Sequence, residues 1–394
     1  MMYDLATLLL VLLFGSPLVI FLFYGTILLF YSRPHPKNAR EARSTDILSY
    51  EPTVSVVLPT HDEQDVITNR IENLLHLNYP KDKMEIIIVD DSVDSTPKIV
   101  EQYMKTNHQI RMIRFDCRMG YSPCLIAGCK AAEGEVVVLA EASSLMDEEA
   151  IRYLVSNFVN PNIGVVTGKA RVLNPLEGAE KSEVFYLRLY DFARSAESNM
   201  DSTIYVRGEA AAIRRSLLVD LKDLENFPGT ADTGLAIMAR KKGFKAVCDP
   251  RVLFFEHAPA FHRERIHQKV TRGANLTKAL WAFRSMFLKP EYGKFGMITL
   301  PVSFAMLAIV PLLLLVGFFV FVLVTLMNPA TYYPIWIVAA FLVAFALVFW
   351  RPAVFTAFES EYSLLRALYD IVVLRKSHDK IDKVTSTRRW TSDR

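Results

Sequence analysis

Residues 86–94 read IIIVDDSVD, an apolar run that ends in three acids within five positions. A short apolar run closed by turn-forming residues is typical of a buried strand. Further acids occur in the segments Glu141-Ala142-Ser143 and Thr230-Ala231-Asp232. Open α/β sheets bind ligands beyond the carboxyl ends of their strands, so acids that are distant in sequence can share one site there. The pattern predicts such a site at a sheet edge.

Similar apolar runs alternate with helical patterns along the first half of the chain. We expect strands at 54–58, 85–89, 111–115 and 135–139, and helices at 66–77, 97–105 and 147–158. Alternation of β and α units at this spacing predicts an α/β domain with a mostly parallel, Rossmann-like sheet and covering helices.

The composition indicates a soluble domain joined to membrane helices. The chain of 394 residues is 52% hydrophobic, which is high for a soluble enzyme, and 22% charged, which is high for a membrane bundle. Residues 5–31 and 297–350 contain no Asp, Glu, Lys or Arg, and a membrane helix needs about 20 apolar residues. We expect one N-terminal transmembrane helix in 1–33 and two in 297–350. A signal peptide is the alternative for the first, although residues 1–4 carry no positive charge.

Basic residues set the expected orientation. They follow the first apolar stretch, precede the second and are frequent in 351–394. Since Lys and Arg favour the cytoplasmic side, we expect an integral membrane protein with a cytoplasmic central domain, located in the plasma membrane. The net charge of +3 gives no case for nucleic-acid binding, and four cysteines without a CxxC pair indicate reduced thiols.

These features divide the chain into six parts. A polar linker at 34–51 precedes a globular domain at 52–275, and an interfacial helix at 276–296 precedes the two C-terminal spans at 297–350. An amphipathic helix and a basic tail occupy 351–394. The alternative for both amphipathic segments is that they pack on the globular domain.

Five motifs resemble, in order and spacing, the inverting glycosyltransferases of family 2, which have the GT-A fold. They are Leu58-Pro59-Thr60-His61-Asp62-Glu63 and the segments at 88–96, 120–123, 139–144 and 208–215. The resemblance covers about residues 52–274. The flanking apolar stretches resemble those of membrane-integrated members such as hyaluronan and cellulose synthases.

The resemblance implies a nucleotide-sugar donor, with a UDP-sugar favoured. It assigns base or ribose contacts to Asp90, Asp91 and Asp94, since carboxylates accept strong hydrogen bonds from N–H and O–H groups. The other expected donor-site residues are Thr60, Asp62, Glu63, Ser143 and Arg118. The alternative for Asp91 is a turn-capping aspartate, because the sequence Asp-Asp-Ser-x-Asp also favours turns.

The segment Glu141-Ala142-Ser143 stands where the family usually has Asp-x-Asp, which holds a divalent cation at the diphosphate. The resemblance therefore implies Mg²⁺ or Mn²⁺, ions that prefer oxygen ligands. Glu141 supplies a carboxylate and Ser143 only a neutral oxygen, so we expect weakened metal affinity. His257 is a candidate additional ligand, and a purely structural histidine is the alternative.

Asp232 occupies the place of the family's general base, the acid that deprotonates the acceptor hydroxyl during inverting transfer. The alternative is a helix N-cap. Gln268, Lys269 and Arg272 stand where processive members carry Gln-x-x-Arg-Trp beside the acceptor and the diphosphate. This motif is incomplete here, which weakens the case for a long extruded polymer.

We therefore expect a membrane-bound hexosyltransferase that moves a sugar from an NDP-sugar to a lipid or lipid-linked saccharide at the cytoplasmic face. A processive polysaccharide synthase is the alternative enzyme. The incomplete motifs also allow a catalytically silent subunit that binds sugar nucleotides within a membrane assembly.

Overall fold

The computed structural model describes residues 2–33, 49–173, 179–220, 231–257, 262–349 and 351–373. Its centre is an eight-stranded sheet with the order β3-β2-β1-β4-β7-β6-β8-β5. The strands are β1 (Val54–Thr60), β2 (Met84–Asp90), β3 (Ile110–Arg114), β4 (Val136–Ala140), β5 (Ser144–Met146), β6 (Ile163–Val172), β7 (Ala210–Arg214) and β8 (Lys245–Glu256).

The prediction of a mostly parallel sheet is correct for β3, β2, β1 and β4 and for the β6–β8 pair, but not for the other pairs. β3, β2, β1 and β4 are parallel neighbours, and their near-continuous apolar runs suit strands that are buried on both faces. In the other half, β7 is antiparallel to β4 and to β6, and β5 is antiparallel to β8. The sheet is therefore mixed. An apolar run such as β7 has the same pattern in either direction, so the sequence does not reveal this reversal.

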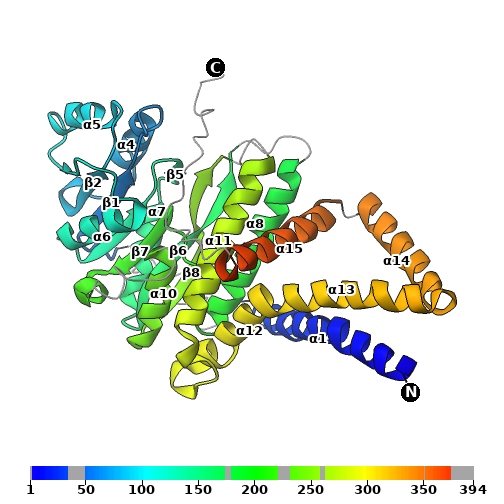
Figure 1. Cartoon of the computed structure of the whole chain (residues 1–394). Coiled ribbons are helices and arrows are strands. Elements are labelled where there is room, and N and C mark those ends of the chain that lie inside the picture. The colour runs from blue at the N-terminus through cyan, green and yellow to red at the C-terminus, as the bar shows by residue number, and fades with distance from the viewer. Residues whose placement is uncertain are drawn as a thin grey trace.

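Helices cover both faces of the sheet (Figure 1). One face packs against α4 (Ile67–Leu75), α5 (Thr96–Met104) and α7 (Ala150–Ser156). The other packs against α6 (Tyr121–Ala131) and α10 (Ala231–Lys241). Successive side chains of a strand point to opposite faces, and accordingly Val56 and Leu58 enter the first core while Val57 enters the second.

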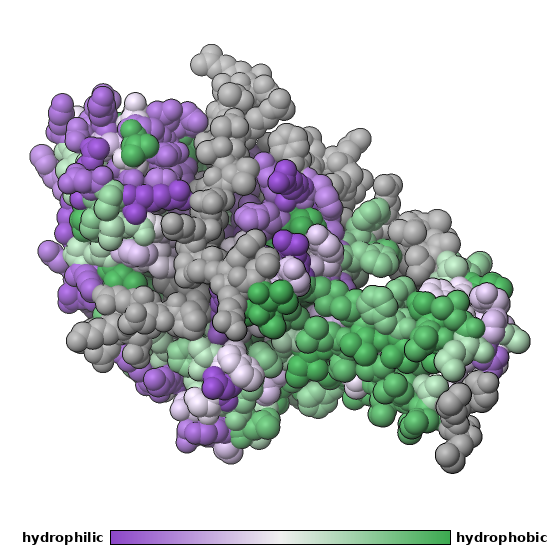
Figure 2. All heavy atoms as spheres, in the orientation of Figure 1, coloured by the Kyte–Doolittle hydropathy of each residue, from purple (hydrophilic) through white to green (hydrophobic). Residues whose placement is uncertain are grey.

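Apolar helices extend from this domain. α1 (Met2–Phe30) and α13 (Val310–Met327) run side by side away from the sheet (Figure 1), with Phe14 close to Gly317. Two segments, Leu5–Phe30 and Phe295–Met327, are long and apolar enough to cross a membrane. Figure 2 shows hydrophobic residues gathered over these helices. α14 (Pro329–Phe349) is a further apolar helix, and the predicted count of three spans stays a prediction.

The predicted separate helix at 276–296 is wrong, because α11 (His262–Ala282) continues across its start. One apolar face of α11 continues on both sides of residue 276. On this face, Leu276 and Leu280 are buried in a cluster with Ile204 and Phe295. Short turns at Arg284–Met286 and Pro290–Tyr292 follow, before α12 (Leu300–Phe304). This part of the chain therefore packs on the globular domain, which was the alternative to an interfacial helix.

The C-terminal amphipathic helix also packs on the domain through one face. α15 (Arg351–Val372) lies against α11 and α8 (Ala179–Met200), and Ala367 joins an apolar cluster with Val270 and Ala274. Its other face exposes Phe358 and Tyr362. Residues 34–48 of the predicted linker and 374–394 of the predicted tail lie outside the described residues.

Candidate active site

The carboxyl ends of β1, β2 and β4 meet at one edge of the sheet, since these strands are parallel neighbours. Thr60 and Asp90 face each other in register at the ends of β1 and β2. Asp90 is fully buried and accepts hydrogen bonds from Thr60 Oγ1 at 2.8 Å and from Ser92 Oγ at 2.6 Å. Its carboxylate ties the two strand ends together, which favours a supporting role over direct contact with a nucleobase.

Asp91 binds the loop that precedes α6. Its Oδ2 accepts hydrogen bonds from the backbone N–H groups of Met119 at 2.8 Å and Gly120 at 2.9 Å, and its Oδ1 lies 2.8 Å from His61 Nδ1. Burial would raise the pKa of Asp91, but the N–H groups of Gly120 and Met119, with His61, lower it overall. Gly120 has φ 93°, a conformation open to glycine. At 3% exposure, Asp91 fits the turn-capping alternative better than a contact with the nucleotide.

Reciprocal hydrogen bonds join the loops that follow β1 and β2. Asp62, which has φ 51°, accepts a hydrogen bond from the backbone N–H of Val93 at 2.9 Å. Asp94 accepts hydrogen bonds from the backbone N–H groups of Gln64 at 3.1 Å and Thr96 at 2.9 Å. The Asp62 side chain keeps 36% exposure, so a ligand can reach this carboxylate at the sheet edge.

Two further predicted donor-site residues differ in their exposure. Glu63 is buried, and its backbone N–H donates a hydrogen bond to Thr96 Oγ1 at 2.9 Å. Arg118 is exposed on the loop between β3 and α6. Only Arg118 of these two is placed to meet a ligand from solvent.

The register of the sheet places Ser143, two residues after Glu141, opposite His257. Ser144 pairs with Glu256 across the antiparallel β5–β8 ladder, so Ser143 and His257 are the next residues on the facing chains. Burial lowers the pKa of His257, which favours the neutral imidazole that metals bind. Among the described residues, no group of three or more His, Cys, Asp and Glu could hold a metal ion. Two protein ligands still fit Mg²⁺ or Mn²⁺ when a diphosphate and water supply the other oxygens.

Arg207 holds two more carboxylates in this region. The antiparallel β4–β7 ladder places Glu209 beside Glu141. Arg207 donates from Nη2 to Glu256 Oε2 at 2.6 Å and from Nε to Glu209 Oε2 at 3.2 Å. Burial would raise the pKa of Glu209, but Arg207 lowers it well below its usual range. A carboxylate that binds protons so weakly is a poor general base at neutral pH.

Arg272 on α11 interacts electrostatically with the same carboxylates. Burial and Arg207 would lower the pKa of Arg272, but Glu256 and Glu209 raise it overall. Its side chain is nevertheless exposed, so its guanidinium can bind an anion such as a diphosphate. The sequence predicted Arg272 and missed Arg207. The available signal was its position, two residues before Glu209 at the start of a recognised motif.

Asp232 is the second residue of α10, and its side chain lies outside the described part of the structure. The topology places the start of α10 at the ligand edge. After α10 the chain turns at Gly243, with φ 89°, and returns as β8, which is parallel to β6 and ends at that edge. α10 rises about 16 Å over its 11 residues and packs against β8 and β6, so its amino end points toward the same edge.

Residues 55–221 match the family model described as "Glycosyl transferase family 2". They form a glycosyl transferase family 2 domain. "Probable glycosyltransferase YdaM" of Bacillus subtilis is 28% identical over 215 residues, which cover 53% of this chain and 51% of that protein. "Poly-beta-1,6-N-acetyl-D-glucosamine synthase" of Staphylococcus epidermidis is 24% identical over 237 residues, which cover 60% of this chain and 57% of that protein. The chain thus matches little more than half the length of these curated relatives.

A solved structure extends the likeness beyond the family 2 domain. The mannosyltransferase PcManGT from Pyrobaculum calidifontis, in complex with GDP-Man and Mn²⁺, has a TM-score of 0.73 and 23% identity to this chain. The likeness covers 95% of this chain and 100% of that chain. It confirms the predicted GT-A fold.

Beyond residues 55–221, Lys269 of α11 binds Glu359 of α15 and so joins these two helices. Its Nζ donates to Glu359 Oε2 at 2.7 Å and lies 4.6 Å from the centre of the Tyr186 ring. Arg265 Nη2 donates to the other oxygen of Glu359 at 2.6 Å. Lys269 is 6% exposed, so the structure does not present it to a diphosphate. The neighbouring Gln268 is exposed.

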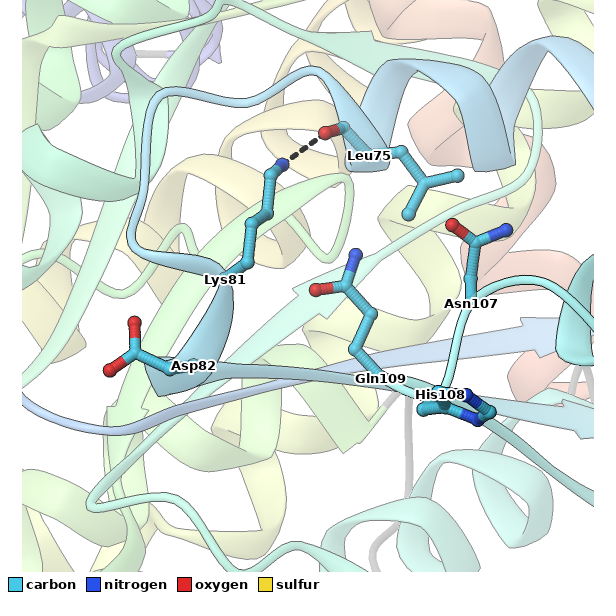
Figure 3. Close-up of a pocket in the computed structure, with 6 residues that line it drawn as sticks. All are labelled: Leu75, Lys81, Asp82, Asn107, His108 and Gln109. Atoms are coloured by element: carbon cyan, nitrogen blue, oxygen red, sulfur yellow. Dashed lines mark hydrogen bonds between the residues drawn. The ribbon is translucent and has the colours of Figure 1, made fainter.

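A cavity of about 450 Å³ lies at the opposite edge of the family 2 domain (Figure 3). Its lining includes Lys81 and Asp82, before β2, and His108 and Gln109, before β3. These positions are at the amino ends of the strands, roughly 23 Å from the acids along a seven-residue strand. The cavity therefore takes no part in the candidate active site.

Proposed function

We propose that this protein transfers a sugar from an NDP-sugar to a lipid or lipid-linked saccharide at a membrane surface. The observation that carries the proposal is the cluster of Glu141, Arg207 and Arg272 at the carboxyl edge of a family 2 domain whose flanking helices are long and apolar. The names of the relatives and the GDP-Man bound to the structural neighbour support a nucleotide-sugar donor. The resemblance to family 2 favours a UDP-sugar over a GDP-sugar, and the test includes both.

The proposed chemistry is a single inverting displacement. Asp232 removes the proton of the acceptor hydroxyl while that oxygen bonds to the anomeric carbon, and the bond from that carbon to the diphosphate breaks. Arg272 stabilises the charge on the departing diphosphate through charge-assisted hydrogen bonds. Because Arg207 is hydrogen-bonded to Glu209 and Glu256, we propose Asp232 and neither of these glutamates as the base. A divalent cation held by Glu141 and His257 would neutralise part of the diphosphate charge when bound.

The helices around the domain support an acceptor that lies in the membrane. α15 packs on α11, which carries Arg272, and presents Phe355, Phe358 and Tyr362 on its exposed face. Aromatic residues favour the interface between lipid and water. On the other side, the hydroxyl of Tyr24 in α1 donates a hydrogen bond to Glu197 in α8. These contacts would hold the site at the membrane surface, with the family 2 domain in the cytoplasm.

A processive polysaccharide synthase is the second candidate function. The poly-N-acetylglucosamine synthase relatives favour it. The incomplete motif at Gln268–Arg272 weighs against it, because Thr271 and the buried Lys269 offer no free cation to a growing polymer. A silent nucleotide-binding subunit is the third.

One experiment separates these functions. The purified full chain in lipid nanodiscs is incubated with radiolabelled UDP-GlcNAc, UDP-glucose or GDP-mannose, together with lipid-phosphate and glycolipid acceptors. We expect one sugar, or a few, on an organic-extractable lipid. A long water-soluble polymer would support the processive synthase. Nucleotide binding without any labelled product would support the silent subunit.

A further inference from the structure

The two apolar segments that are long enough to cross a membrane end at the same level beside the globular domain. These segments are Leu5–Phe30 and Phe295–Met327. Tyr31 directly follows the first, and Lys294 directly precedes the second. Lys294 Nζ donates a hydrogen bond to the Tyr31 hydroxyl at 2.6 Å. The end of α1 therefore lies close to the start of α12 (Figure 1), and a membrane crossed by both segments would have its surface there.

Residues 281–294, which we call the junction segment, lie at this level and pack on the globular domain only in part. Met286 is buried in the cluster that includes Ile204. In contrast, Trp281 is 55% exposed, and its ring stacks on Phe304 of α12 with ring centres 5.5 Å apart. The Arg284 guanidinium lies 4.7 Å from the centre of the Trp281 ring. Tryptophan favours the interface between lipid and water, and arginine can extend its charge from there to the headgroups.

Leu288 of the junction segment is exposed in a backbone conformation that leucine rarely adopts. It is 66% exposed and has φ 57°. The turn is fixed, because the Leu288 N–H donates a hydrogen bond to the Gly296 carbonyl at 2.9 Å. Arg240 of α10 donates from Nε and Nη2 to the Tyr292 carbonyl, each at 3.1 Å. An exposed leucine is common, but a leucine held at positive φ by the surrounding structure needs a reason.

The junction segment is basic as well as apolar. It contains Arg284, Lys289 and Lys294 and one acid, Glu291. Glu291 lies 3.7 Å from Lys289, and both side chains are more than half exposed, so this ion pair is weak. An anionic lipid surface strengthens binding by about fivefold for each lysine or arginine that reaches it. An acidic protein surface would match these charges, but it would not match the neighbouring apolar segments.

We propose that the junction segment docks on an anionic lipid surface, with Trp281 and Leu288 inserted among the lipids and its basic side chains on their phosphates. The inference rests on the membrane location in the proposed function and does not depend on sugar transfer. This surface is separate from the candidate active site, because Arg240 and Asp232 lie near opposite ends of α10. Since Arg240 binds the junction segment, docking would also fix the globular domain relative to the bilayer.

Spin labels on the full chain in lipid nanodiscs test the insertion of Leu288. Cys117 is exposed and the other three cysteines are buried, so Cys117→Ser provides a background for one added label. Electron paramagnetic resonance then measures how strongly dissolved oxygen and a water-soluble nickel complex relax the label. In nanodiscs of phosphatidylcholine and phosphatidylglycerol, a label at Leu288→Cys should lie about 5–10 Å into the boundary between headgroups and acyl chains.

Two further label positions calibrate this measurement. Gln102→Cys is the control in water, because Gln102 is exposed on α5, at the end of the domain away from α1 and α13 (Figure 1). Leu312→Cys is the control in the membrane, because Leu312 is 47% exposed on α13. The label at Leu288 should resemble the Leu312 label in its poor access to the nickel complex.

Lipid retention tests the basic side chains. Native mass spectrometry compares the amounts of phosphatidylglycerol and phosphatidylcholine that stay bound to protein released from mixed nanodiscs. Wild type should retain phosphatidylglycerol preferentially, and the double substitution Arg284→Gln and Lys289→Gln should reduce this preference at least about fivefold. The matched control is Lys98→Gln with Lys105→Gln, two exposed lysines at α5, which should leave the preference unchanged.

Either measurement can overturn the proposal. A Leu288 label as accessible to the nickel complex as the Gln102 label would do so, and so would an unchanged lipid preference in the doubly substituted protein. If the labelled Leu288→Cys protein does not fold, Lys289→Cys is judged by the same criterion. Sugar transfer is measured in parallel. An inserted label without any transfer contradicts the proposed function alone, whereas transfer with a water-exposed Leu288 label contradicts this inference alone.

Discussion

Replacing Asp91 by alanine distinguishes a structural carboxylate from one that binds the nucleotide. The substitution leaves the backbone N–H groups of Met119 and Gly120 without their acceptor. A hydrogen bond to a charged group contributes about 1.5–3 kcal/mol, so two such bonds amount to about 3–6 kcal/mol. Water can reach the loop, since Met119 is 43% exposed. We therefore expect the free energy of unfolding to fall by about 3–4 kcal/mol.

Thermal unfolding of the full chain measures this effect. A loss of that size lowers the Tm by about 6–16 °C for a domain of this length. Asp116→Ala, which changes an exposed acid on the same loop, is the control and should change the stability by less than about 0.5 kcal/mol. An unchanged Tm in Asp91→Ala together with lost affinity for UDP and GDP would refute the structural assignment.

The pH dependence gives a second readout of the same variant. The folded protein lowers the pKa of Asp91, so its contribution is complete above the unfolded pKa of about 3.9 and is lost as the pH falls through the folded pKa. The difference in stability between wild type and Asp91→Ala should therefore be largest near neutral pH and shrink in acid. A constant difference across this range would contradict the charge-based explanation.

Two other substitutions test the buried ion pairs. Arg207→Met leaves Glu209 and Glu256 without their partner and should cost about 3–5 kcal/mol in chemical denaturation at neutral pH. This cost should fade below about pH 4, because Arg207 lowers the pKa of Glu209 in the wild type; equal stability at neutral pH would show that the pair is not important. Glu359→Gln removes the charge shared by Arg265 and Lys269, so α15 should become sensitive to limited proteolysis, whereas Arg366→Gln on its more exposed side should not. Unchanged cleavage of Glu359→Gln would mean that apolar contacts alone hold α15.

The sequence was sufficient to predict the strands whose carboxyl ends carry the candidate site residues. The runs before Thr60, Asp90 and Ala140 are apolar at nearly every position, and a short run of this kind suits a buried parallel strand. The direction of β7 was not predictable, because an apolar run does not encode direction. The sequence could not show whether the apolar face of residues 276–296 packs on the membrane or on the globular domain. It packs against a surface that includes Ile204, which is far away in the sequence.

The roles of single acids were harder to predict than their positions. Asp91 is 28 residues from the N–H group that it binds most closely, so a motif at 90–94 cannot distinguish a cap from a ligand contact. Lys269 matched a diphosphate-binding position, but Glu359 on a distant helix binds it instead. Arg207 gave no periodic signal. Its charge is compensated only by Glu209 and Glu256, which the fold places beside it.

The central claim is that this protein transfers a sugar with Asp232 as the general base. The most direct test compares the rate of sugar transfer and the affinity for the nucleotide between wild type and Asp232→Asn, which keeps the side-chain shape and cannot accept the proton. A base contributes about 10²–10⁴-fold to the rate, so we predict a loss of that size in transfer with nearly unchanged nucleotide affinity. Transfer close to the wild-type rate, or a loss of nucleotide binding in proportion to activity, would contradict the account.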